Sequence, residues 1–179
     1  MLCEEAVRKK DLREEENTPR RVCFVCTGNT CRSPMAAAVA NHLSRLSLEA
    51  LPESVRDCAT PPIEAFSAGL YAVEGEPISS HAVSALEEVG VIPTDTADYR
   101  KHTAHTLTDA LAESCDLLVG MSGGHVMELI LRYPHLAYKI VCMPTPISDP
   151  FGGDADRYKA CLREITQGVR ALLFEECEA

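Results

Sequence analysis

The sequence has no long hydrophobic run, and this absence limits where the protein can work. Among its 179 residues, no apolar stretch approaches the roughly 20 residues that a membrane-spanning helix needs. The N-terminus is charged and carries no apolar stretch of the kind found in secretory signal peptides. We therefore expect a cytoplasmic protein that does not work at a membrane.

Positive charge is also scarce. The chain has 17 Lys and Arg residues against 27 Asp and Glu residues, which gives a net charge of -10. Such a balance speaks against nucleic acid as a partner. Any anion-binding site must be made by local geometry, because the overall field of the protein opposes it.

Residues 1–20 have mixed charge and little apolar periodicity, so we expect a charged N-terminal extension that is solvated or disordered. No internal repeat, low-complexity tract or linker divides residues 21–179, which are enough to bury the core of a single domain. The nine cysteines are an odd number in a chain without a secretion signal. Several lie in apolar runs, such as Cys23 and Cys142, and we expect them to be small buried hydrophobic residues.

Strands and helices are expected to alternate along the chain. The four expected strands are 22–25, 63–67, 116–120 and 138–142. The expected helices are 35–46, 80–89, 107–114, 124–132 and a long last helix with Tyr158, Cys161, Ile165, Val169 and Leu172 on one face. Alternation predicts an α/β fold, with a four-stranded parallel sheet and helices on both faces, doubly wound and flavodoxin-like. We expect Ser33 to cap the helix that follows strand one, Pro34 to begin it, and Asp154 to cap the last helix.

The loop after the first strand carries the most unusual chemistry. Cys26-Thr-Gly-Asn-Thr-Cys-Arg-Ser33 runs from a strand into a helix, so its backbone N–H groups can converge on an anion. Gly28 and Asn29 tolerate left-handed backbone, and Arg32 can hold two phosphate oxygens. A thiol such as Cys26, near a helix N-terminus and an arginine, ionises readily and can attack a phosphoryl group. Ser33 can donate a hydrogen bond to that thiolate. A plain glycine-containing turn with two core cysteines is the alternative.

The loop after the fourth strand should face the first one, because the carboxyl ends of parallel strands meet at one edge of the sheet. It contains Asp149-Pro150. A carboxyl group there can protonate the leaving group and then activate water. Asp-Pro is also common in plain turns. Asp154 and Asp156 are nearby alternatives that are better placed to cap the last helix.

The loop string resembles the active-site loop of the low-molecular-weight protein tyrosine phosphatase family, and the resemblance runs from about residue 21 onward. It implies a protein phosphatase that works through a cysteinyl-phosphate intermediate, without a metal or cofactor. Cys26 would be the nucleophile, Arg32 the phosphate clamp and Asp149 the general acid. The resemblance also implies a set of substrate-binding residues: Thr27, Gly28, Asn29, Thr30, Cys31, Ser33 and Phe151. Its partners would be phosphorylated proteins, and the sequence leaves the oligomeric state open.

Thr30 and the string Asp-Pro-Phe-Gly-Gly bear on the substrate. Many phosphotyrosine enzymes of the family have an aliphatic residue at the Thr30 position and two aromatic residues after Asp-Pro. This chain instead looks like the bacterial protein arginine phosphatase branch. A hydroxyl at Thr30 would meet a polar guanidinium or orient water, whereas an aliphatic side chain favours a flat phenyl ring. Phosphoarginine is therefore expected ahead of phosphotyrosine.

Three other functions fit parts of the pattern. An arsenate reductase on the same scaffold needs resolving cysteines after the third strand, where GMSGGHVMELI has none. Cys23-x-x-Cys26 has the spacing of redox and zinc motifs. A phosphate-binding module would keep the phosphate-binding loop but catalyse no reaction.

The remaining histidines and the second loop cysteine are weaker features. We expect His102 and His105 on the surface, and we find no constellation around His81, His125 or His135. A reversible Cys26–Cys31 disulfide that protects the nucleophile is a separate hypothesis.

Overall fold

The computed structural model describes residues 18–50, 62–93 and 97–174. It contains one parallel sheet in the strand order β2-β1-β3-β4. The strands are β1 (Arg20–Cys26), β2 (Ile63–Gly69), β3 (Leu117–Gly120) and β4 (Ile140–Cys142). Most of the predicted N-terminal extension lies outside the described residues.

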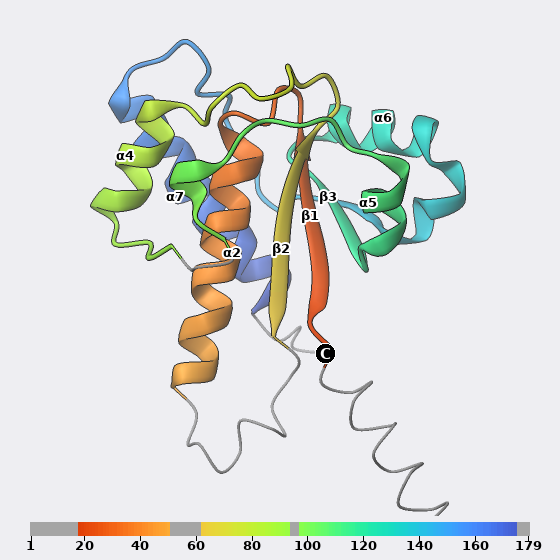
Figure 1. The fold of residues 1–179 in the computed structure, drawn as a ribbon, viewed down its shortest axis with the longest axis horizontal. Coiled ribbons are helices and arrows are strands. Elements are labelled where there is room, and N and C mark those ends of the chain that lie inside the picture. Colours follow the sequence, from red (N-terminus) through yellow and green to blue (C-terminus); the bar gives the residue numbers. More distant parts are fainter. Residues whose placement is uncertain (1–17, 51–61, 94–96, 175–179) are drawn as a thin grey trace, which may run out of the picture.

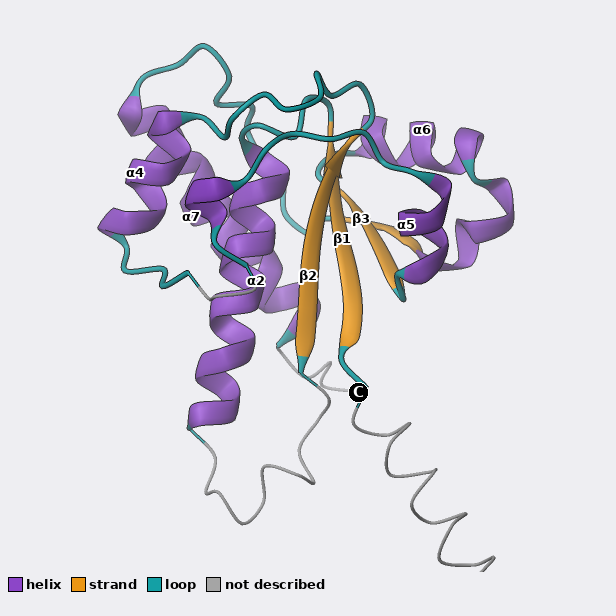
Figure 2. Cartoon of the chain, in the orientation of Figure 1, coloured by secondary structure: helices purple, strands orange, loops and turns teal. Residues whose placement is uncertain are grey.

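Helices cover both faces of the sheet (Figures 1 and 2). On one side lie α2 (Arg32–Glu49) and α7 (Ala155–Leu173), with α4 (Ser80–Glu88) packed against them. On the other side lie α5 (Asp109–Ser114) and α6 (Gly123–Arg132). Two 3₁₀ helices, η1 (Tyr99–Lys101) and η2 (Pro134–Lys139), complete the described elements. The doubly wound α/β architecture predicted from the alternating pattern is confirmed.

Strand β1 is the centre of two hydrophobic cores. Val22 and Phe24 point into the core with α2 and α7, whereas Cys23 and Val25 point into the core with α5 and α6. Both cores are apolar, which explains why this strand is continuously apolar and does not alternate. Cys23 and Cys26 belong to opposite cores, so the Cys-x-x-Cys spacing does not bring the two thiols together as a redox or zinc pair.

Side chains of α2 pair with the backbone of edge strand β2. Asn41 Nδ2 donates to the Ala65 carbonyl and Asn41 Oδ1 accepts from the Ala65 N–H, both at 2.9 Å. Ser44 Oγ accepts from the N–H of Ile63 at 2.8 Å. These bonds satisfy part of an edge that would otherwise be open to strand addition. They also fix α2 against the sheet, and therefore fix the loop that leads into α2.

Two local predictions at helix ends have different outcomes. Helix α2 begins at Arg32, two residues earlier than a Ser33 cap requires, and Cys31 occupies the N-cap position without a side-chain bond. The prediction of Ser33 as N-cap and Pro34 as first helical residue is therefore wrong, because the Ser33 hydroxyl is used in the site described below. Asp154 caps α7 by accepting from the N–H of Arg157 at 3.1 Å, as predicted.

Further differences concern the second half of the chain. Cys142 is exposed at the end of β4 and is not the buried hydrophobic residue that its apolar flanks predicted. Strand β4 begins at Ile140, because the preceding residues form η2. Among the described residues, no helix is long and apolar enough to cross a membrane.

Candidate active site

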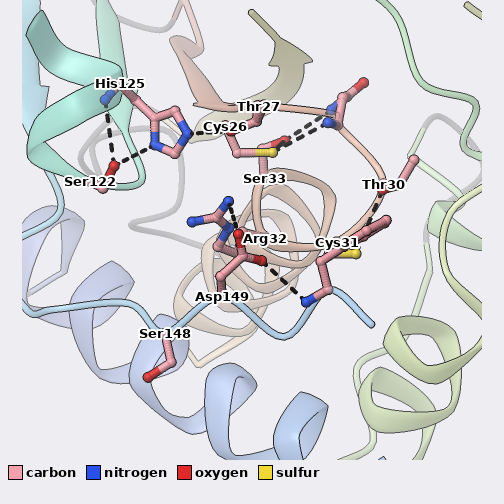
Figure 3. Close-up of polar contacts among 12 residues, drawn as sticks. Cys26, Thr27, Thr30, Cys31, Arg32, Ser33, Ser122, His125, Ser148 and Asp149 are labelled. Atoms are coloured by element: carbon pink, nitrogen blue, oxygen red, sulfur yellow. Dashed lines mark hydrogen bonds and ion pairs between the residues drawn. The ribbon is translucent and has the colours of Figure 1, made fainter. Parts of the chain in front are cut away.

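The loop after β1 and the loop after β4 meet at the carboxyl edge of the sheet (Figures 1 and 3). The first loop joins β1 to α2 and contains the residues from Cys26 to Arg32. The second loop joins β4 to α7 and contains Asp149. The structure therefore brings together the three residues that the sequence singled out for chemistry, Cys26, Arg32 and Asp149.

The Cys26 sulfur lies in the floor of the loop, and the residue is 3% exposed. Its Sγ is 3.0 Å from Ser33 Oγ and accepts a hydrogen bond from the backbone N–H of Asn29 at 3.3 Å. Ser33 Oγ is also 3.3 Å from the carbonyl of Ala68. A thiolate can only accept, so an ionised Cys26 takes the Ser33 hydroxyl hydrogen. Two donors and the N-terminus of α2 then stabilise the negative sulfur.

Asn29 holds the loop in its curved shape. Its φ of 58° is the one positive value outside glycine among the described residues. The buried side-chain amide donates to Ser33 Oγ and Ser67 Oγ, each at 3.0 Å. The side-chain oxygen Oδ1 of Asn29 accepts a hydrogen bond from the backbone N–H of His105 at 3.0 Å. Every hydrogen-bonding atom of this side chain is thus used, and the bonds reach two distant segments.

His102 completes the support of Asn29. Its Nε2 lies 2.9 Å from the backbone carbonyl of Asn29, so this nitrogen carries the proton and donates. Burial lowers the pKa of His102, although the bond to Asn29 acts in the opposite direction. The prediction that His102 and His105 are simple surface residues is therefore wrong. Both are only part-exposed, and both contact the loop.

Gly69, at the end of β2, allows a close approach to this loop. A Cβ atom there would lie 2.8 Å from the Thr27 carbonyl oxygen and 3.2 Å from Asn29 Cβ. The next two residues hydrogen-bond the loop, from the N–H groups of Leu70 to Cys26 O and of Tyr71 to Thr27 O, both at 2.9 Å. The end of β2 and the two residues after it therefore support the loop from one side through backbone contacts, beside the Ser67 bond to Asn29.

Several backbone N–H groups of the loop have no acceptor in the described part of the chain, namely those of Gly28, Thr30 and Cys31. Arg32 lies at the start of α2, and its side chain is only 11% exposed. Converging amides, a helix N-terminus and a guanidinium are the features that hold a phosphate dianion. The loop can therefore cradle a phosphoryl group above Cys26.

Arg32 and Asp149 contact each other directly. Arg32 Nη2 donates to Asp149 Oδ2 at 2.8 Å, and the aspartate side chain is 54% exposed. The other oxygen, Oδ1, accepts from the N–H of Phe151 at 3.2 Å. The carboxyl group thus reaches the guanidinium that would clamp a phosphate, from the open side of the site. A carboxyl group in this position can exchange a proton with a group bound next to Arg32.

Cys31 and Thr30 occupy the far side of the loop. Cys31 Sγ lies 3.1 Å from the hydroxyl of Tyr158 on α7 and 3.6 Å from Thr30 Oγ1. Burial raises the pKa of the Cys31 thiol and also raises that of Tyr158 to about 12. Both stay protonated at neutral pH. Thr30 is half-buried, and its carbonyl accepts from the N–H of Ser79 at 2.9 Å.

Phe151 and Thr27 are exposed at the mouth of the site. Phe151 is 76% exposed, in a turn that continues to Gly152 with a positive φ of 72°. Thr27 follows the cysteine directly, and its hydroxyl Oγ1 is 3.0 Å from His125 Nε2 (Figure 3).

His125 was missed by sequence reasoning, which found no constellation around it. It lies in the first turn of α6, where Ser122 Oγ contacts its ring nitrogen Nδ1 at 2.8 Å. The Ser-x-x-His spacing at a helix start was the available local signal, but the contact with Thr27 joins residues 98 positions apart. His125 is therefore part of the site through tertiary structure.

Comparison with known proteins agrees with this geometry. The sequence profile of the family described as low molecular weight phosphotyrosine protein phosphatase matches residues 21–179. The chain belongs to this family. A protein-arginine-phosphatase of Geobacillus stearothermophilus is 32% identical to this family member over 157 residues, which are 82% of this chain and 89% of the relative.

Solved structures of the family superimpose on this chain. A low molecular weight protein tyrosine phosphatase from T. tengcongensis has 33% identity and a TM-score of 0.71, covering 86% of this chain and 97% of its own. A YwlE arginine phosphatase mutant with a phosphorylated active site serine has 29% identity and a TM-score of 0.69, covering 85% of this chain and 92% of its own.

Replacement of Asn29 tests its role in the loop. Asn29→Gly removes the side-chain bonds but accepts the left-handed backbone, whereas Asn29→Ala also forces a Cβ into it. We expect Asn29→Ala to lower the free energy of unfolding by about 1–2 kcal/mol more than Asn29→Gly. Both variants should lose most phosphatase activity. Urea unfolding measures the stabilities, and equal values for the two variants would contradict a strained loop.

Proposed function

We propose that this phosphatase removes phosphoryl groups from phosphoarginine side chains of proteins, with phosphotyrosine as a second substrate. The single observation that supports the chemistry is the placement of a cysteine sulfur, against the Asn29 N–H and the Ser33 hydroxyl, in the floor of a loop whose arginine contacts a carboxylate at 2.8 Å. We infer that residues 21–179 are the catalytic unit and that it acts in the cytoplasm. The charged extension is not needed for the reaction.

In the first step the Cys26 thiolate attacks phosphorus with its lone pair. The bond from phosphorus to the leaving nitrogen or oxygen breaks, and the leaving group takes the proton of Asp149. Arg32 and the loop amides hold the three phosphoryl oxygens, whose negative charge they balance in the transition state. The product of this step is cysteinyl-phosphate and a free guanidine or phenol.

In the second step water attacks the cysteinyl-phosphate. Asp149, now a carboxylate, accepts a proton from that water, and the sulfur–phosphorus bond breaks. Inorganic phosphate forms and the sulfur leaves as a thiolate. The hydroxyl of Ser33 and the N–H of Asn29 stabilise the leaving sulfur, because they already contact it.

Two features favour phosphoarginine as the substrate. Thr30 gives the loop a polar side chain where an aliphatic one would favour a phenyl ring. Phe151 is followed by Gly152 and Gly153, so only one aromatic side chain follows Asp-Pro at the mouth. A relative of similar length is a protein-arginine-phosphatase, which supports the same choice.

A panel of phosphorylated peptides tests the function. We expect release of phosphate from phosphoarginine and phosphotyrosine peptides but not from phosphoserine peptides. Cys26→Ser should abolish release, because the nucleophile is lost. The matched control, Cys142→Ser, changes an exposed cysteine that follows β4 and should keep full activity. Arsenate reduction without phosphate release would instead support the reductase alternative.

Removal of the proposed acid should depend on the leaving group. Asp149→Asn is expected to slow hydrolysis of phosphotyrosine about 10²–10⁴-fold, the usual contribution of general acid–base catalysis. The loss should be smaller for p-nitrophenyl phosphate, whose leaving group needs less protonation. Steady-state kcat on both substrates measures this. Asp156→Asn, an exposed acid in the first turn of α7, is the control. Equal losses on the two substrates would argue against proton donation by Asp149.

Thr30→Ile tests substrate choice. The change replaces a polar by an aliphatic side chain and should lower the ratio of kcat/KM for phosphoarginine to that for phosphotyrosine. A tenfold change in the ratio corresponds to about 1.4 kcal/mol of differential binding in the transition state. Thr166→Ile on α7 is the matched control and should leave the ratio unchanged. An unchanged ratio in Thr30→Ile removes the argument for this residue.

A further inference from the structure

His125 connects α6 to the phosphate loop through one hydrogen bond. The residue is 7% exposed, and its Nε2 is 3.0 Å from the hydroxyl of Thr27, the residue that follows the cysteine. On the other side of the ring, Nδ1 is 2.8 Å from Ser122 Oγ. The three side chains form a chain of hydrogen bonds from a helix cap to the mouth of the site (Figure 3).

The cap favours one direction for these bonds. Ser122 Oγ accepts from the backbone N–H of His125 at 3.4 Å, so its own hydrogen is free to go to Nδ1. A neutral ring that accepts at Nδ1 carries its proton on Nε2 and donates to Thr27 Oγ1. The hydroxyl hydrogen of Thr27 is then left for an acceptor at the mouth. The opposite tautomer would consume that hydrogen, because Nε2 would then accept from Thr27.

We propose that His125 is a positioning residue that orients the hydroxyl of Thr27 toward the substrate, with its tautomer fixed by Ser122. Thr27 is exposed and directly follows Cys26 in the loop, so the proposal places its hydroxyl at the mouth where a phosphoryl oxygen or the leaving group would bind. A bound anion strengthens the arrangement, because it accepts the hydrogen that His125 leaves available. The proposal rests on the proposed function, since it concerns binding of a phosphorylated substrate.

The charges around the ring agree with a neutral His125. Burial lowers its pKa, and the Arg32 guanidinium lowers it further, whereas the Asp149 carboxylate acts in the opposite direction. At neutral pH the ring is therefore uncharged and has one N–H to donate. A single N–H makes the choice of tautomer decisive for Thr27.

A double-mutant cycle on Thr27 and His125 tests the coupling. Thr27→Val and His125→Ala should each lower kcat/KM roughly five- to tenfold, the size of one neutral hydrogen bond. If His125 acts through the Thr27 hydroxyl, the double variant should be no slower than Thr27→Val alone. His125→Gln, whose amide N–H can reach Thr27, should recover most of the loss. If the losses in kcat/KM of the two single variants multiply in the double variant, the proposal is overturned.

Controls separate positioning from folding. His135→Ala changes an exposed histidine on η2 and should leave kcat/KM unchanged. Thermal unfolding of each variant, together with recovery in His125→Gln, distinguishes a misfolded loop from a lost hydrogen bond.

Nitrogen NMR of the imidazole gives an answer that does not depend on turnover. In Cys26→Ser protein titrated with inorganic phosphate, His125 should be protonated on Nε2 and not on Nδ1. A ring protonated on Nδ1 with phosphate bound would overturn the proposal even if the kinetics agreed. If the wild-type protein hydrolyses neither phosphoarginine nor phosphotyrosine, the proposed function fails, and this spectrum still decides the role of His125.

Discussion

The left-handed backbone of Asn29 is the constraint on which the rest of the site depends. A residue at φ 58° turns the loop back on itself, so that the N–H of the same residue points at the Cys26 sulfur. Asparagine tolerates this conformation better than most side chains, but the conformation still costs free energy. Bonds from Asn29 to Ser33, Ser67 and His105 offset that cost. Helix α2, strand β2 and the segment before α5 are thereby tied to one residue.

Local geometry also explains how an acidic protein can hold a phosphate. The net charge of -10 repels anions at long range. Within the loop, however, amides and the start of α2 supply positive potential at contact distance, where screening by water is weakest. Arg32 is mostly buried, so its charge acts on the cradle and much less on the surrounding solvent. Specific contacts at short range therefore outweigh the overall field.

The sequence was sufficient wherever the relevant residues are neighbours or are related by a topological rule. Cys26, Asn29 and Arg32 lie in one continuous loop, and the position of Asp149 follows from the rule that parallel strands end at one edge. The strands and most helices were also predicted from the sequence, because the apolar periodicity that marks them is set by residues close together in the chain.

What the sequence could not reveal comes from distant segments. His102 and His125 contact the loop from positions after β2 and β3. Neither lies in a sequence motif that indicates which residue it contacts. Ser33 has the local pattern of a helix cap, yet its hydroxyl contacts Cys26, as the sequence predicted, together with Asn29 and the Ala68 carbonyl. The cap prediction was wrong because these contacts engage the hydroxyl. The exposure of Cys142 was missed similarly, since apolar neighbours do not reveal where a short strand ends.

The two thiols of the loop show how one fold distinguishes between identical side chains. Cys26 receives hydrogen bonds from Asn29 N–H and, as a thiolate, from Ser33, and both favour negative charge on sulfur. Cys31 faces the Tyr158 hydroxyl on α7, where burial raises its pKa and keeps it a thiol. Five residues separate them, but the turn at Asn29 directs one sulfur to the donors and leaves the other against a helix. The curvature that brings the loop amides together therefore also places only one of the two cysteines where it can act as the proposed nucleophile.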